Sequence, residues 1–372
     1  MSRLHAGDLV EVRTKEEILR TLDKEGRLDG MPFMPQMFEY CGRRFKVYKR
    51  AHKTCDTIAW NWDYPGRSVA DGIHLNLRCD GKAYGGCQAA CLIFWKEQWL
   101  KLVDAADGAT VLPTTADDAD LPRYVAPEAE CTEADVLSAT CAKIENAVDD
   151  TIYTCQATRL LDFTKPLSWW NIGQYVEDYT SGNATLWQIV RGTIYLCYYY
   201  GTLAKLGGPG GWIYDRFQSL WGGLPFPRHR GKLQVGQSAP IEALNLRPGE
   251  LVRIKSYDDI LGTIDKNNKN RGMSFDGEMM PFCGKTYRVR NRVERFIDEK
   301  TGKMKTLKTP AVILDNVYCQ ARYSEHRMFC PRSIFSWWRE VWLERVSDAQ
   351  EQINTGALPT ESKMSAQPGV GH

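Results

Sequence analysis

The chain has 372 residues, of which 43% are hydrophobic and 25% charged, so it can bury sizeable cores in two or three domains and is not disordered. Its twelve cysteines follow an N-terminus without an apolar leader. This combination predicts a cytoplasmic protein whose reduced thiols serve in metal ligation, catalysis or burial rather than in a disulfide framework.

The formal net charge of +2 conceals a segregation of charge along the chain. Residues 1–104 carry 17 basic and 14 acidic side chains, residues 105–150 carry 2 and 11, and residues 247–347 carry 20 and 13. The basic segment could bind nucleic acid or an acidic protein, or it could be balanced by the chain's own acidic segment.

The same module occurs twice. Residues 7–56 align with residues 249–298 at a constant offset of 242 without a gap. After a variable insert the match resumes, with Cys79 over Cys319 and Cys87 over Cys330. An internal duplication is the simplest explanation.

Both copies predict the same elements in the same order. Each begins with a short alternating strand, at residues 9–12 and 251–254, after a glycine-containing turn. A helical turn, a Met/Pro-rich loop, two further strands and a tryptophan-rich closing segment follow. Short strands with polar turns predict a small antiparallel barrel or sandwich. The closing tryptophans, at Trp95, Trp99, Trp337, Trp338 and Trp342, are expected to mark the core, although stacking on bases or sugars stays open.

The opening of the second copy, PGELVRIKS, resembles the first strand of SH3-like barrels of the KOW type. The run from Gly7 to Cys41-Gly42 resembles the SH3-like domain of nitrile hydratase beta subunits. The whole chain also resembles an uncharacterised bacterial protein family with tandem modules of this kind. These resemblances imply a fold and no activity.

The segment between the copies predicts helices. Residues 105–130 read as an acidic linker, and Thr132 begins a helix with Asp135 in a capping box, running to about Ala147. A second helix, around 183–206, carries too many polar groups for a membrane span and is expected to be buried. Residues 207–240 are rich in Gly and Pro and predict loops.

The predicted fold class is therefore α+β, with two SH3-like small β-barrel modules flanking an α-helical middle domain. The modules cover residues 1–104 and 247–347, and the middle domain covers 131–246. Residues 348–372 are expected to form a disordered tail.

The strongest chemical signal is a cysteine cluster in the first copy. This copy adds Cys55 and Cys91 to the shared Cys79 and Cys87, where the second copy has Ile297 and Ile334. Four thiolates from separate segments predict a tetrahedral zinc site, with a tight turn supplied by Gly85-Gly86 and with His52 as a further ligand or neighbour. The spacing matches neither a zinc ribbon nor a ferredoxin, so an iron–sulfur cluster and plain burial stay open.

The other cysteines give weaker signals. Cys41 and Cys283 precede a glycine in both copies and predict shared packing. Cys319 and Cys330 are only a pair, and Cys155 has no histidine near it in sequence; the sequence leaves open whether these three are functional.

Two basic strands alternate charged and apolar residues, and Arg288, Arg290 and Arg292 could contact phosphate. No phosphate loop, dinucleotide fingerprint or nucleophile elbow occurs. The sequence thus predicts a metal-stabilised, non-catalytic binding or scaffold protein with a protein partner, accessory to a bacterial biosynthetic pathway. The alternatives are a redox or zinc-dependent enzyme using the cysteine cluster, and a nucleic-acid-binding protein.

Overall fold

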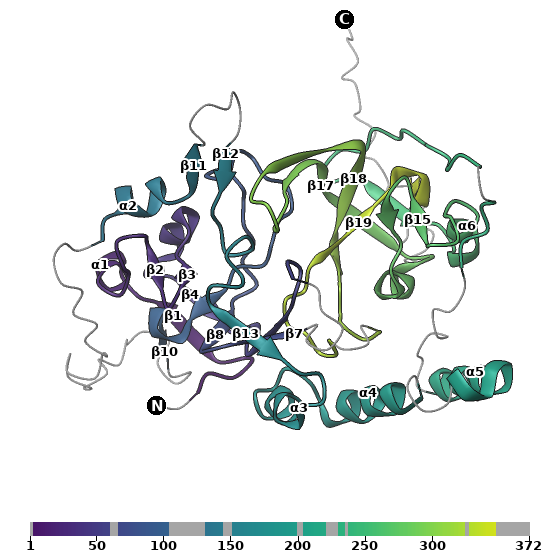
Figure 1. Cartoon of the computed structure of the whole chain (residues 1–372), viewed down its shortest axis with the longest axis horizontal. Coiled ribbons are helices and arrows are strands. Elements are labelled where there is room, and N and C mark those ends of the chain that lie inside the picture. The colour runs from purple at the N-terminus through teal and green to yellow at the C-terminus, as the bar shows by residue number, and fades with distance from the viewer. Residues whose placement is uncertain are drawn as a thin grey trace, which may run out of the picture.

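The computed structural model describes residues 3–59, 66–103, 131–143, 151–198, 204–220, 230–234, 237–323 and 327–346. The predicted linker 105–130 and tail 348–372 lie outside these residues. The described part is a mixed α+β structure of mostly small antiparallel sheets and few helices, with the two copies side by side (Figure 1). We call the copies repeat 1 (residues 7–103) and repeat 2 (residues 249–346).

Repeat 1 is built from short strands around one helical turn. Its strands are β1 (Leu9–Val12), β2 (Arg27–Leu28), β3 (Met31–Pro32), β4 (Arg44–Lys46), β5 (Lys49–Arg50), β6 (Lys53–Cys55), β7 (Gly66–Val69), β8 (Gly72–His74), β9 (Trp95–Lys96) and β10 (Leu100–Leu102). The helices are α1 (Lys15–Leu19) and two 3-10 helices, Pro35–Tyr40 and Glu97–Trp99. Its sheets have the orders β10-β1-β4, β5-β8-β9 and β2-β3.

Repeat 2 follows the same plan with longer strands. Its elements are β14 (Leu251–Ile254), α6 (Tyr257–Leu261), β15 (Lys269–Asn270), β16 (Met273–Ser274), the 3-10 helix Gly277–Phe282, β17 (Thr286–Ile297), β18 (Met304–Tyr318), β19 (Phe335–Trp338), the 3-10 helix Glu340–Trp342 and β20 (Leu343–Arg345). The main sheet has the order β19-β18-β17-β14-β20. As described it is open at β19 and β20, so the predicted closed barrel is not found among these residues.

The two repeats share backbone geometry as well as sequence. Val10 pairs with Phe45 and Leu102, and Val252 pairs with the equivalent Tyr287 and Arg345. Left-handed residues recur at equivalent positions: Asn76 and Asn316 have φ of 58° and 61°, and Ala90 and Ser333 have φ of 50° and 44°. The duplication is therefore a duplication of structure.

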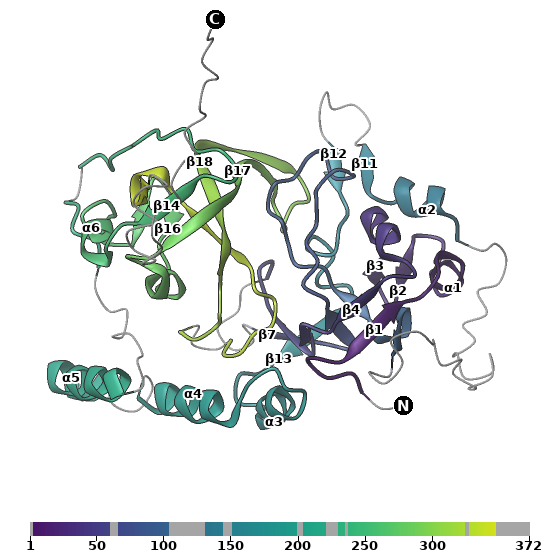
Figure 2. The same cartoon turned by 180° about the vertical axis from the view of Figure 1, so that it is seen from behind.

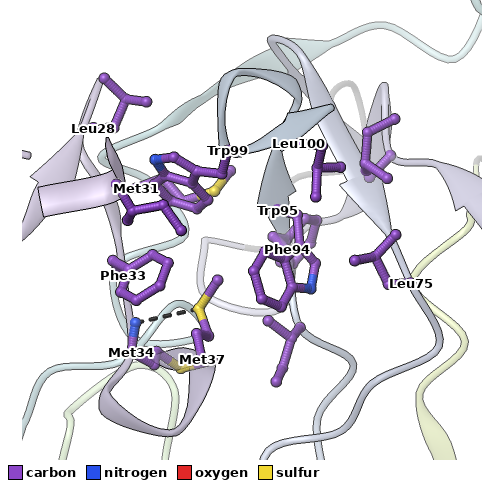
Figure 3. Packing of buried hydrophobic residues seen from close by; sticks show 14 of the residues in the cluster. Leu28, Met31, Phe33, Met34, Met37, Leu75, Phe94, Trp95, Trp99 and Leu100 are labelled. Carbon is purple, nitrogen blue, oxygen red and sulfur yellow. Dashed lines mark hydrogen bonds between the residues drawn. The ribbon is translucent and has the colours of Figure 1, made fainter. Parts of the chain in front are cut away.

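Each repeat has its own aromatic core. In repeat 1 the ring of Phe33 meets Trp95 and Trp99 edge-on, at centroid distances of 6.3 and 5.1 Å (Figure 3). In repeat 2, Phe275 meets Trp338 and Trp342 in the same way, at 6.1 and 5.5 Å. These four tryptophans are fully buried, which confirms that they mark the core.

The middle segment is shared between both repeats. Its elements are α2 (Glu133–Ser138), β11 (Cys141–Lys143), β12 (Thr151–Tyr153), β13 (Thr164–Leu167), α3 (Ile172–Thr180), α4 (Leu186–Tyr198) and α5 (Ala204–Leu220). Strand β13 extends the β6–β7 hairpin of repeat 1, while β12 forms a bridge from Ile152 to Lys303 beside β18 of repeat 2. Helices α3, α4 and α5 follow one another along one edge of the molecule, in both views (Figures 1 and 2).

Three predictions for this segment need correction. Thr132 and Asp135 do form a capping box, but α2 ends at Ser138 instead of near Ala147, because the chain turns there into β11. Helix α4 was expected to be buried, yet Leu186 is 61% exposed. Helix α5 runs through a Gly/Pro-rich stretch that predicted a loop. Its Tyr214 is buried against Tyr195 of α4, and such tertiary packing can override poor helix propensity.

Among the described residues, no helix combines the length and apolarity needed to span a bilayer.

Candidate functional site

Four thiols line one small cavity, which we call the first cysteine cavity. They belong to Cys79, Cys87, Cys91 and Cys155, and the remaining wall is mostly apolar. The cavity has a volume of about 30 Å³. That is room for about two water molecules or a single ion, and it is far too small for an organic substrate.

Glycine turns place the three cysteines of repeat 1 at the wall of this cavity. Gly81 has φ of +70°, and a Cβ atom there would lie 1.9 Å from the carbonyl oxygen of Cys87. Gly85 and Gly86 also have positive φ. The Cys79 amide donates to the Cys91 carbonyl at 2.8 Å, so these two residues lie on adjacent segments. The stretch from Cys87 to Cys91 is irregular, neither helix nor strand.

Cys155 reaches this cavity from the middle segment. The turn after β12 directs the backbone amides of Thr158 and Ala157 toward its sulfur. The sequence leaves the role of Cys155 open, and no local pattern marks it. Ile297, the equivalent of Cys55 in repeat 2, also lines the cavity, so the two repeats supply no fourth thiol there and Cys155 supplies it.

Hydrogen-bond donors point at the sulfurs of this cavity. Gln36 Nε2 donates to Cys79 Sγ at 3.2 Å, and the Ile297 amide donates to Cys87 Sγ at 3.4 Å. Burial nevertheless raises the pKa of Cys79 to about 12 and raises the pKa of Cys91 and Cys155 as well. Without a cation these thiols therefore hold their protons at neutral pH.

Cys55 lies elsewhere, in the second cysteine cavity. It shares that cavity, of about 20 Å³, with Cys319 and Cys330 of repeat 2 and with the side chains of Arg327 and Arg332. The predicted set of Cys55, Cys79, Cys87 and Cys91 is thus divided between two cavities.

The division follows a pseudo-two-fold relation between the repeats. Cys55 contributes to the cavity of Cys319 and Cys330, while Ile297, its equivalent, contributes to the cavity of Cys79 and Cys87. Each repeat therefore supplies a hairpin residue to the cavity of the other, as in an isologous dimer. This exchange could not be read from spacing within one copy.

Arg332 occupies the contact between the repeats and lines both cavities. Its side chain is only 4% exposed and donates to both carboxylate oxygens of Glu299 at 3.0 Å and to Thr57 Oγ1 at 2.9 Å. Thr57 and Glu299 hydrogen-bond to each other and are equivalent residues of the two repeats, as expected close to a two-fold axis.

The thiols of the second cavity differ in acidity. The nearby Cys330 thiol, together with the charges of Arg332 and Arg327, lowers the pKa of Cys55. The proximity of Cys55, together with burial, raises the pKa of Cys330. Burial also raises the pKa of Cys319. Cys55 is therefore the most acidic of the three thiols.

His52 was a predicted ligand, but it lies at neither cavity. Its Nε2 is 3.3 Å from Asp178 Oδ1 in α3 and 3.2 Å from the Gln174 carbonyl. The neighbouring Lys53 also pairs with Asp178 and lies 4.9 Å from the ring centre of Tyr175. His52 and Lys53 therefore dock α3 onto repeat 1.

Within the residues described, no group of three or more His, Cys, Asp or Glu side chains already stands in the arrangement of a metal centre. Cys41 and Cys283 are half-buried at the edge of the two cores, each at the end of a 3-10 helix, and burial raises the pKa of both. Their shared packing was predicted.

The predicted phosphate-contacting arginines bind groups of the protein itself. Arg290 pairs with Asp315 and lies over the ring of Phe335, and Arg292 pairs with Glu294 and Glu340. Arg288 donates to the Gly249 carbonyl.

Helices α3 to α5 expose many apolar side chains. Their exposed fractions are 74% for Ile172, 55% for Val176, 66% for Trp212 and 80% for Leu220. We call this row of helices the apolar arm.

The chain matches no protein-family model, and no curated protein matches it significantly.

Proposed function

We propose that this chain is a non-catalytic binding or scaffold protein in which one zinc ion in the first cysteine cavity joins repeat 1 to the middle segment. The ligands are Cys79, Cys87, Cys91 and Cys155. The observation that carries the proposal is that four cysteines, three from repeat 1 and one from the middle segment, line one ion-sized cavity. The set differs from the one predicted from sequence by the exchange of Cys55 for Cys155.

The surroundings of the cavity suit a zinc–thiolate centre. A zinc ion with four thiolates carries a net charge of −2, and the buried guanidinium of Arg332 at the cavity wall would offset part of it. The donors at Gln36 and Ile297 would hydrogen-bond the bound sulfurs and orient them. Binding requires the thiols to turn toward the cavity centre and to lose their protons.

The architecture of repeat 2 and the small size of both cysteine cavities favour a non-catalytic binding role. Five antiparallel strands with a 3-10 turn before the last strand, as in repeat 2, support the SH3-like expectation. The two cysteine cavities are too small for catalysis on an organic substrate.

The partner we propose is a protein that covers the apolar arm. Basic residues are few along the arm: α3 contains no Lys or Arg, α4 contains Arg191, and α5 contains Lys205 and Arg216. Helices that lie on anionic membranes are instead rich in Lys and Arg. The arm therefore fits a protein surface better than a lipid surface.

The experiment is metal analysis of protein purified without a metal-affinity step. We expect zinc at about one ion per chain, and about one proton released per coordinated thiol, so up to about four per zinc ion, when zinc is added to the metal-free protein near neutral pH. Cys155→Ser should lose the zinc, whereas Cys283→Ser, which changes a half-buried thiol at the core of repeat 2 and outside the cavity lining, should retain it. A brown, iron-containing protein would show that the cavity holds an iron–sulfur cluster instead of zinc. A native protein without bound metal would refute the proposal.

A further inference from the structure

We propose that Cys55 and Cys330 form a redox-active dithiol that a hydroperoxide converts into a disulfide between the two repeats. This site is separate from the proposed zinc site and uses none of its ligands.

The two thiols are neighbours by structure and distant by sequence. They belong to one buried cluster with Ala321 and line the same cavity. Both are free thiols in this structure. Because Cys55 belongs to repeat 1 and Cys330 to repeat 2, a bond between them would link the repeats covalently.

The charges around Cys55 prepare it as the attacking group. Arg332 Nη1 lies 4.0 Å from Cys55 Sγ and also donates to the Cys55 carbonyl at 3.4 Å. Arg327 adds a second positive charge that favours the thiolate form of Cys55. The negative charge of Glu299, the ion-pair partner of Arg332, disfavours it. A thiolate stabilised by guanidinium groups next to a protonated thiol is the arrangement of an attacking and a resolving cysteine.

The size of the cavity selects the oxidant. Its volume of about 20 Å³ admits a molecule close to water in size. Hydrogen peroxide meets this limit, whereas the disulfide of glutathione does not. Cys319 lines the same cavity but is only partly buried, against the cluster that Cys55 and Cys330 form with Ala321.

The chemistry has two balanced steps. The Cys55 thiolate attacks one peroxide oxygen, the O–O bond breaks, and the departing hydroxide takes up a proton to leave as water. Cys330 then attacks the sulfur of the resulting Cys55 sulfenic acid, so that the S–S bond forms and the S–O bond breaks. The hydroxyl group leaves with the Cys330 proton as a second water. The dithiol loses two electrons and the peroxide gains them.

The test uses the full chain, reduced, freed of reductant and treated with a stoichiometric amount of hydrogen peroxide. Free thiols are then blocked, and tryptic peptides are analysed by mass spectrometry without reduction. Trypsin releases Cys55 in the peptide 54–67, Cys330 in 328–332 and Cys319 in 309–322, each with one cysteine. We expect peptides 54–67 and 328–332 linked, with two hydrogens lost.

Variants separate this chemistry from misfolding. Cys330→Ser should leave a sulfenic acid on Cys55, which shows that Cys55 reacts even when no disulfide can form. Dimedone traps this group once the peroxide-treated protein is unfolded in urea, because the folded cavity is too small to admit dimedone. Cys319→Ser should form the Cys55–Cys330 link at a rate within twofold of the native rate. The proposal is overturned if Cys55 stays reduced, if it links to Cys319, or if Cys319→Ser abolishes the link. It is also overturned if dimedone, added in urea after the peroxide, labels no sulfenic acid on Cys55 of a Cys330→Ser protein that had native circular dichroism before unfolding.

Discussion

Replacing Arg332 by Met should destabilise the protein more than any exposed arginine replacement, because Arg332 holds the two repeats together. Its side chain is 4% exposed and makes hydrogen bonds to Glu299, Thr57 and the Cys55 carbonyl. Removing one partner of a buried ion pair costs about 3–5 kcal/mol. Glu299 is 24% exposed and can recover some hydration, so we expect the lower end, about 3 kcal/mol.

A matched control exists in the same repeat. Arg345 pairs with Glu250 at 2.9 Å, but its side chain is 52% exposed. Arg345→Met should therefore cost about 0–1 kcal/mol. The free energy of unfolding is measured with urea, from the tryptophan fluorescence of both cores.

The double variant Arg332→Met with Glu299→Gln refines the test. Because it leaves no unpaired buried charge, it should lose less stability than the sum of the two single variants. Equal losses for Arg332→Met and Arg345→Met, or a loss under about 1 kcal/mol for Arg332→Met, would refute the role of this ion pair.

Three further predictions follow from the structure. Gly81→Ala should lower stability and zinc content severely in urea unfolding and metal analysis, because its Cβ would collide with the Cys87 carbonyl. Gly42→Ala should cost only about 1 kcal/mol, because Gly42 has φ of +71° but open space where the Cβ would lie. Ile172→Glu combined with Trp212→Glu should change the unfolding free energy by less than about 0.5 kcal/mol, because both side chains are exposed. The pKa of Cys55 is lowered in the folded protein, so its stabilising contribution is complete above the ordinary thiol pKa and is lost as the pH falls through the lowered value. The difference in unfolding free energy between the native protein and Cys55→Ser, measured in reductant, should therefore shrink from pH 9 to pH 5. A difference that grows over this range would contradict the sign.

Sequence patterns predicted what depends on local spacing. The recurrence of tryptophans located both cores, the glycines around Cys87 predicted the tight turn, and the pair Thr132 and Asp135 predicted a helix start. In each case the physical determinant lies within a few residues of the signal.

The arrangement of the thiols depends on tertiary contacts and could not be predicted in the same way. Within repeat 1, nothing distinguishes Cys55 as a residue that serves repeat 2, because that follows from how the two repeats face each other. Cys155 carries no local sign of its role either. Helix α5 shows the same limit, since Tyr214 packs against Tyr195 and the helix forms through a stretch whose propensity predicts a loop.

Zinc content compared between Cys55→Ser and Cys155→Ser tests the central claim most directly. If Cys155 completes the first cysteine cavity, Cys55→Ser keeps about one zinc ion per chain and Cys155→Ser loses it. The opposite result, with zinc lost from Cys55→Ser and retained by Cys155→Ser, would contradict the division of the thiols between the two cavities.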